Sequence, residues 1–154
     1  MNILTIGDNA PDFSGDSTHG NILMPKILVK YIVLYFYPKD MTPGCTIQAQ
    51  EFTKLYEEFK AVDSEIVGVS KDGLSSHQKF KEKENIPYPL LLDIEEKICN
   101  LYGVISEKNM FGKKYLGINR TTFLIDGQRK IIKIWKQVKP THHAKIVLDT
   151  IKFE

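Results

Sequence analysis

Residues 31–46 read YIVLYFYPKDMTPGCT, an apolar run that breaks at a proline and then leads into a cysteine. The first part, residues 31–37, is continuously apolar and β-prone, which is typical of a strand buried on both faces. Thr42 is a good helix N-cap, and Pro43 is favoured at the first helical position. The stretch therefore predicts a strand, a short loop and a helix, with Cys45 in the first helical turn.

The predicted position of Cys45 suits a nucleophilic thiolate. Unsatisfied backbone N–H groups and the positive end of the helix dipole both stabilise negative charge there, and the thiolate is the reactive form of cysteine. Gly44 has no side chain, so a small substrate can approach the sulfur closely. The Thr42 hydroxyl can cap the helix or bind the substrate. The competing interpretation, that a lone cysteine is a small buried hydrophobe, is the favoured one for Cys99.

Strands and helices alternate along the rest of the chain. We expect a short strand within residues 12–17, strands at 65–69, 90–92, 121–125 and 130–138, and helices that follow Cys45, Ser75, Asp93 and Pro140. Ser75 and Gln78 fit a capping box, and Asp93 fits a helix cap. Residues 103–119 are expected to form a long loop. The order predicts an α/β fold with a central mixed β-sheet flanked by helices, in a single domain spanning residues 1–154.

Composition argues against several classes of protein. The net charge is +2, from 21 basic and 19 acidic residues, whereas a general nucleic-acid binder normally has a clustered basic surface. No apolar run is long enough to span a bilayer, and the N-terminus lacks a signal-peptide pattern. We expect a cytoplasmic protein with reduced thiols and no nucleic-acid or membrane partner. Two distant cysteines and the adjacent His142-His143 pair make no metal or cofactor motif, so neither is expected.

The spacing Pro-x-x-x-Thr-x-x-Cys, formed by Pro38, Thr42 and Cys45, resembles the active-site motif of the peroxiredoxins. The fuller stretch, residues 35–46, is similar to the branch called bacterioferritin comigratory protein or PrxQ. Further similar stretches extend the resemblance over nearly the whole chain, at residues 7–13, 66–70, 89–93, 111–115 and 117–126. The resemblance implies a thioredoxin-like fold and thiol-dependent reduction of hydrogen peroxide and organic hydroperoxides, with a role in antioxidant defence and cell redox homeostasis.

The resemblance also implies roles for single residues. Cys45 would be the peroxidatic cysteine, which becomes a sulfenic acid that another thiol must reduce. Thr42 would hydrogen-bond the peroxide, and Pro38 would shield the site from water. Without the resemblance, the sequence around Arg120 indicates only an exposed charge at the start of a strand. With it, Arg120 would hold the thiolate and polarise the peroxide, and Gln48 would support Arg120. The partners would be a peroxide substrate and thioredoxin or another thiol reductant, and the expected state is a monomer.

The thiol that regenerates Cys45 is left open. Many members of this branch have a second cysteine five residues after the first, where this chain has Gln50, or in the next helix near Lys81. The other thiol here is Cys99, at the flank of an apolar helical stripe, a position that allows partial exposure. We expect one-cysteine behaviour with an external thiol; the alternative is that Cys99 resolves Cys45 through a disulfide, within or between chains.

Other functions could use the same cysteine. A peroxide-sensing thiol protein or a holdase-like interaction protein would oxidise Cys45 without fast turnover. Such a protein needs only one reactive thiol, whereas the set of Pro38, Thr42 and Arg120 favours an enzyme. A thioredoxin-like disulfide reductase is disfavoured, because a second cysteine near Cys45 is missing.

Overall fold

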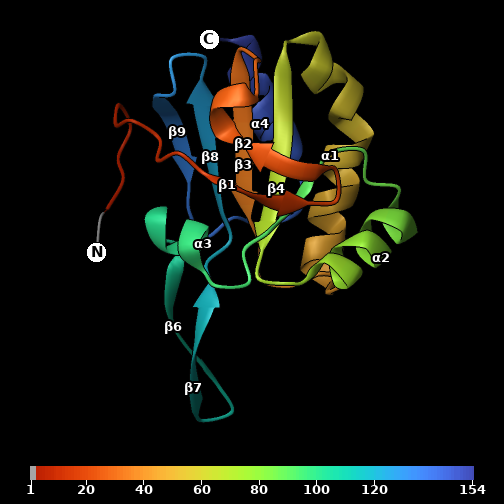
Figure 1. The fold of residues 1–154 in the computed structure, drawn as a ribbon, viewed down its shortest axis with the longest axis vertical. Helices are drawn as coiled ribbons and strands as arrows, with labels where there is room; N and C mark the ends of the chain where they lie inside the picture. Colours follow the sequence, from red (N-terminus) through yellow and green to blue (C-terminus); the bar gives the residue numbers. More distant parts are fainter. Residues whose placement is uncertain (1–2) are drawn as a thin grey trace.

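The computed structural model describes residues 3–154 and contains a seven-stranded mixed sheet with helices on both faces, as predicted (Figure 1). In the order in which they lie across the sheet, the strands are β2 (Gly20–Leu23), β1 (Ser14–Ser17), β5 (Leu90–Leu92), β4 (Ser64–Ser70), β3 (Tyr31–Phe36), β8 (Thr121–Asp126) and β9 (Ile131–Trp135). The helices are α1 (Pro43–Ala61), α2 (Leu74–Glu84), α3 (Lys97–Leu101) and α4 (His143–Lys152), with a short 3₁₀ turn, η1 (Met24–Lys26).

The sheet separates the core into two clusters, and β3, an interior strand, contributes side chains to both. Strand β3 pairs in parallel with β4 and antiparallel with β8. Its alternate side chains face opposite sides of the sheet, as strand geometry requires. The α1-side cluster includes Val33, Tyr35, Cys45, Phe52, Val147 and Leu148. The α3-side cluster includes Ile32, Leu34, Phe36, Ile98, Cys99, Tyr102 and Phe123. Burial of both faces explains why the β3 sequence is apolar without alternation.

The expected loop at residues 103–119 is wrong, because this segment folds into a hairpin. Strands β6 (Ile105–Met110) and β7 (Lys113–Ile118) pair antiparallel in a sheet of their own, which extends away from the body in Figure 1. Phe111 and Gly112 make the turn with φ of +52° and +81°, and the Asn109 side chain accepts a hydrogen bond from the Gly112 N–H. Hairpin turns of this kind usually begin with Asn, Asp or Gly, so a phenylalanine there gives no signal.

Two helix starts differ from expectation. The prediction of a capping box at Ser75 and Gln78 is wrong. Helix α2 begins at Leu74, with Gly73 at the N-cap position and no hydrogen bond from a capping side chain. The cap at Asp93 is confirmed in a modified form. Its carboxylate accepts hydrogen bonds from the N–H groups of Ile98 and Cys99, although α3 itself begins later, at Lys97. Asp93 thus satisfies the helix donors from a position before the helix.

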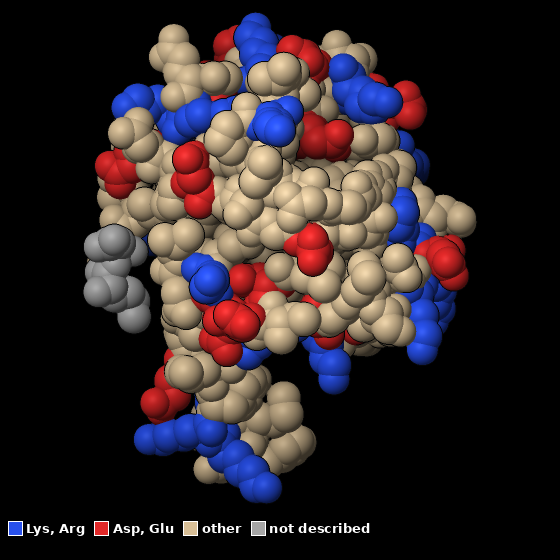
Figure 2. Space-filling model, viewed as in Figure 1, with Lys and Arg blue, Asp and Glu red and all other residues tan. Residues whose placement is uncertain are grey.

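The surface carries charges of both signs. On the face shown in Figure 2, acidic and basic side chains are interspersed over the body, and lysines lie toward the end of the β6–β7 hairpin, which carries Lys113 and Lys114. Within residues 3–154, no helix combines the length and the apolar character needed to cross a bilayer.

Candidate active site

Cys45 lies in the first turn of α1, as predicted, and its side chain is 2% exposed. Thr42 occupies the N-cap position, and its carbonyl accepts the first helical hydrogen bond from Thr46 at 2.9 Å. The Thr42 hydroxyl does not cap the helix. It donates instead to the carbonyl of Lys39 at 2.8 Å, so its oxygen lone pairs remain able to accept a hydrogen bond from a substrate.

Arg120 reaches Cys45 from the start of β8, the strand next to β3. One guanidinium nitrogen, Nη2, donates to Cys45 Sγ at 3.4 Å, and the other, Nη1, donates to Gln48 Oε1 at 2.7 Å. Arg120 can do this because it directly precedes β8, whose first residue, Thr121, pairs with Phe36 at the end of β3. The interpretation of Arg120 as an exposed strand-start charge is wrong. The fold brings Cys45, Gln48 and Arg120 together, with Gln48 fully buried.

Gly44 makes room for Arg120 and Pro140. A Cβ atom on Gly44 would lie 3.0 Å from Arg120 Nη2 and 3.3 Å from Pro140 Cγ. Both distances are tighter than normal contacts. A side chain at this position would therefore displace the guanidinium or Pro140, and the expectation that Gly44 lets a small substrate approach the sulfur stays a prediction.

We predict that Gly44→Ala slows oxidation of Cys45 by hydrogen peroxide by about tenfold, because the added methyl displaces the guanidinium from its fixed position. The rate is measured by quenched flow with thiol alkylation and intact-mass analysis. Gly73→Ala is the matched control, since no atom lies within 4 Å of a Cβ built there. Equal rates for both variants would show that Arg120 tolerates displacement.

Pro38 and Cys99 lie apart from this group. Pro38 is exposed, just after β3, and shielding of the site by Pro38 stays a prediction. Cys99 is fully buried, so the expected partial exposure is wrong. Cys99 belongs to the α3-side cluster and Cys45 to the α1-side cluster, on opposite sides of the sheet. Burial, followed by the nearby Asp93 carboxylate, raises the pKa of the Cys99 thiol well above its ordinary value.

His143 is a buried histidine behind Arg120. Its Nε2 lies 2.8 Å from the Thr122 hydroxyl, and its ring meets Phe52 and Trp135 edge to face. Burial, with a smaller contribution from the Arg120 charge, lowers the pKa of His143 from 6.5 to about 4. The ring is therefore neutral in the folded protein at neutral pH.

We predict that this histidine makes the protein less stable in mild acid. Between pH 6.5 and about 4 the unfolded chain binds a proton that folded His143 does not, so the free energy of unfolding is highest above this range and falls as pH decreases through it. Urea unfolding of wild type and His143→Gln at about pH 7 and about pH 5 measures the effect. The wild type should lose about 2 kcal/mol more than the variant. Equal losses would contradict the prediction.

Two polar residues beside this site were not predicted from the sequence. Asp40, between Pro38 and Thr42, is buried and lies 2.7 Å from His77 of α2. The position of Asp40 between Pro38 and Thr42 of the motif could have marked it as a residue near the site. No pattern in the sequence links it to His77, because the two are 37 positions apart.

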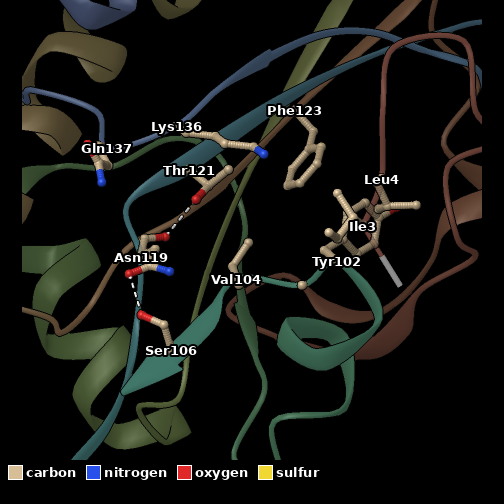
Figure 3. A pocket seen from close by; sticks show the side chains of 11 residues that line it. Ile3, Leu4, Tyr102, Val104, Ser106, Asn119, Thr121, Phe123, Lys136 and Gln137 are labelled. Atoms are coloured by element: carbon tan, nitrogen blue, oxygen red, sulfur yellow. Dashed lines mark hydrogen bonds between the residues drawn. The ribbon is translucent and has the colours of Figure 1, made fainter. Parts of the chain in front are cut away.

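A cavity of about 530 Å³ lies away from the sulfur (Figure 3). Tyr102 and Phe123, which belong to the α3-side cluster, form part of its wall. Figure 3 also shows Asn119 receiving hydrogen bonds from Ser106 and Thr121 in this wall. The cavity therefore lies across the sheet from Cys45 and is not the space in which a substrate would meet the thiol.

Comparisons with known proteins point in one direction. Residues 6–134 match the AhpC/TSA family. Peroxiredoxin Bcp of Bacillus subtilis is 47% identical over 150 residues, covering 97% of this chain and 96% of that protein. A PrxQ structure from Xylella fastidiosa has a TM-score of 0.93 and 33% identity, covering 99% of this chain and 98% of that one. The bacterioferritin comigratory protein of Xanthomonas campestris, whose structures concern alkyl peroxide reduction, has a TM-score of 0.86 and 37% identity, with 92% and 90% coverage.

Proposed function

The chain belongs to the AhpC/TSA family, in the branch of the Bcp and PrxQ peroxiredoxins, and from this we propose that Cys45 is the peroxidatic cysteine. The chain has the thioredoxin-like fold and the thiol-dependent peroxidase function of that branch. The observation that carries the assignment is the Arg120 guanidinium, which donates to Gln48 and to Cys45 Sγ at the start of α1. A fixed cation beside a sulfur at a helix N-terminus stabilises the thiolate.

In the first step the Cys45 thiolate attacks one oxygen of the peroxide. An S–O bond forms as the O–O bond breaks, and the leaving oxygen departs as hydroxide or alkoxide, which takes up the proton that the thiol released to solvent when it ionised. The sulfur is oxidised to a sulfenic acid, and the peroxide is reduced to water or an alcohol. Charge moves from sulfur to the leaving oxygen, so donors fixed around both atoms lower the barrier. Arg120 and the Cys45 N–H are the proposed donors.

Thr42 and Pro38 complete the proposed site. The Thr42 hydroxyl proton is held by the Lys39 carbonyl, which leaves the oxygen to accept a hydrogen bond from the peroxide. This contact orients the attacked oxygen toward the sulfur. Pro38 is assigned the role of limiting water at the mouth of the site. The substrate is a peroxide, either hydrogen peroxide or an organic hydroperoxide.

We further propose that an external thiol regenerates Cys45. That thiol attacks the sulfenic acid, forms a mixed disulfide and releases water; a second thiol then releases the Cys45 thiolate and leaves with a disulfide. Full burial of Cys99 on the other side of the sheet supports this one-cysteine scheme. Thioredoxin is the proposed reductant, and the proposed setting is a monomer in the cytoplasm that serves antioxidant defence.

The assignment is tested by trapping the intermediate. Reduced protein is treated with one equivalent of hydrogen peroxide and then with dimedone, which labels sulfenic acids, and the labelled peptide is found by mass spectrometry. The label is expected on Cys45. In parallel, peroxide loss is followed with thioredoxin as the electron source. Label on Cys99 would overturn the residue assignment, and label on Cys45 without turnover would point to a sensor.

We predict that Cys99→Ser keeps full peroxide turnover with thioredoxin, within about twofold of wild type, because Cys99 lies on the other side of the sheet from Cys45 and takes no part in the proposed chemistry. The expected cost is a modest loss of stability at a buried site. The measurement is thioredoxin-dependent peroxide loss, with intact-mass analysis of wild type after one equivalent of peroxide. Loss of turnover together with a Cys45–Cys99 disulfide in wild type would make Cys99 the resolving thiol.

A further inference from the structure

A group of buried polar side chains surrounds Asp40, next to the loop that leads into α1. Asp40 is 4% exposed and His77 is fully buried. The Asp40 carboxylate lies 2.6 Å from the Tyr37 hydroxyl, 2.8 Å from the Ser76 hydroxyl and 2.7 Å from His77 Nδ1. The chemistry derived above uses none of these groups.

The hydrogen bonds define how protons are shared between Asp40 and His77. His77 Nε2 lies 3.0 Å from the Leu91 carbonyl, which can only accept, so Nε2 carries a proton. A second proton lies between Nδ1 and the carboxylate, on one or the other. In both arrangements the net charge of the Asp40–His77 pair is zero. Both ring nitrogens of His77 and the Asp40 carboxylate are then hydrogen-bonded. A buried pair of this kind is costly to break, because His77 Nδ1 would lose its one partner and the Asp40 carboxylate would lose one of its three hydrogen bonds.

These bonds connect the loop to three other parts of the molecule. The Asp40 N–H donates to the Asp72 carboxylate at 2.8 Å, just after β4. The Asp40 side chain binds Ser76 and His77 of α2, and His77 continues to Leu91 of β5. The Thr42 hydroxyl, by contrast, is bonded only within the loop, to Lys39. The position of the loop, and with it of Thr42, thus depends on Asp40.

The burial of Cys45 makes the position of this loop important for the second half of the reaction. Cys45 is 2% exposed, so the thiol of another protein cannot reach its sulfur in this arrangement. The first turn of α1 and the loop before it must move for a protein reductant to reach the sulfenic acid. We propose that the Asp40–His77 pair is a positioning pair, which holds the loop in the arrangement that reacts with peroxide and whose release controls reduction by a protein thiol. This proposal rests on the assignment of Cys45 as the peroxidatic cysteine.

Two substitutions at His77 separate the contacts that it makes. The amide of Gln reaches the place of Nε2, so His77→Gln keeps the bond to Leu91 and loses the bond to Asp40. The amide of Asn stands at the place of Nδ1, so His77→Asn keeps the bond to Asp40. Tyr102→Phe is the control for lost stability, because it removes a hydrogen bond of 2.6 Å to the Pro11 carbonyl on the other side of the sheet.

The two half-reactions are expected to change in opposite directions. In His77→Gln, reduction of the sulfenic form by thioredoxin should accelerate by about tenfold, because the opening constant of the loop rises by about 20-fold, from about 0.05 to about 1, a shift of about 1.8 kcal/mol. Oxidation of Cys45 by hydrogen peroxide should slow by about twofold, since the ordered fraction of the loop falls from nearly all to about half. Alkylation of reduced Cys45 by a bulky maleimide should accelerate in the same ratio as the reduction. His77→Asn should stay within about threefold of wild type in all three rates.

Each other outcome counts against the proposal. Acceleration of reduction in Tyr102→Phe to the same extent would make the effect one of general stability, and slowing of both half-reactions in His77→Gln would make the pair merely structural. If His77→Gln does not fold, Ser76→Ala removes one bond to Asp40 and must give the same signs with smaller changes. Dimedone labelling of Cys45 in wild type separates failure of this proposal from failure of the assignment of Cys45.

Discussion

Replacement of Cys45 by serine is expected to abolish peroxide turnover, with a loss on the order of 10⁴-fold or more, the scale seen when an enzyme loses its nucleophile. Serine is close to cysteine in size, so the α1-side cluster should keep its packing. The hydroxyl oxygen of serine is not ionised at neutral pH and does not replace a thiolate as a nucleophile. The measurement is hydrogen peroxide loss with dithiothreitol, which reduces the sulfenic acid without a docking requirement.

Cys99→Ser serves as the matched control for this result, because it makes the same chemical change at the other cysteine of the chain. It should retain activity under identical conditions. Turnover by Cys45→Ser above about one hundredth of the wild-type rate would mean that another group attacks the peroxide, given that loss of a nucleophile is normally far more severe.

Arg120→Lys is expected to slow oxidation of Cys45 by about 10²-fold, the cost of losing one fixed donor to a developing charge. The guanidinium reaches Gln48 and Cys45 Sγ at the same time through two nitrogens in one plane. A lysine has one ammonium group and cannot reproduce both contacts with that geometry. Positive charge is retained, so the change isolates the geometry of the donor from its charge. The rate is measured by quenched flow at several peroxide concentrations.

Arg129→Lys is the corresponding control. Arg129 also uses its guanidinium for two contacts, to the carbonyls of Met24 and Ile27, and lies outside the proposed active site. This variant should lose stability without losing the oxidation rate. If Arg120→Lys oxidises Cys45 within about threefold of wild type, Arg120 is not a donor in the transition state.

Much of the fold could be predicted because its signals are local. The β3 strand and the α1 start follow from one continuous stretch, residues 31–46, in which apolar run, N-cap and proline agree. The β6–β7 hairpin was missed for an equally local reason. Its turn residues, Phe111 and Gly112, have positive φ, and a phenylalanine is an unusual choice for the first of them.

The site was predictable in part. Cys45 and Thr42 lie within one motif, whereas Arg120 was placed only by resemblance, since its approach depends on the antiparallel pairing of β8 with β3. The Asp40–His77 contact could not be predicted for the same reason, because it joins two segments that only the folded chain brings together. A residue that acts through long-range packing leaves no periodic or spacing signal in a single sequence.

The burial of Cys99 affects how this protein would lose activity at high peroxide concentration. In the proposed one-cysteine scheme, with Cys99 buried on the far side of the sheet, no internal thiol would compete for the oxidised Cys45. The lifetime of the sulfenic acid then depends on how fast reducing equivalents arrive from outside. When peroxide arrives faster, a second molecule oxidises the same sulfur to the sulfinic acid, a form that ordinary thiols do not reverse. The reductant supply of the surroundings, together with the rate at which the loop opens to that reductant, would set the peroxide dose at which activity is permanently lost.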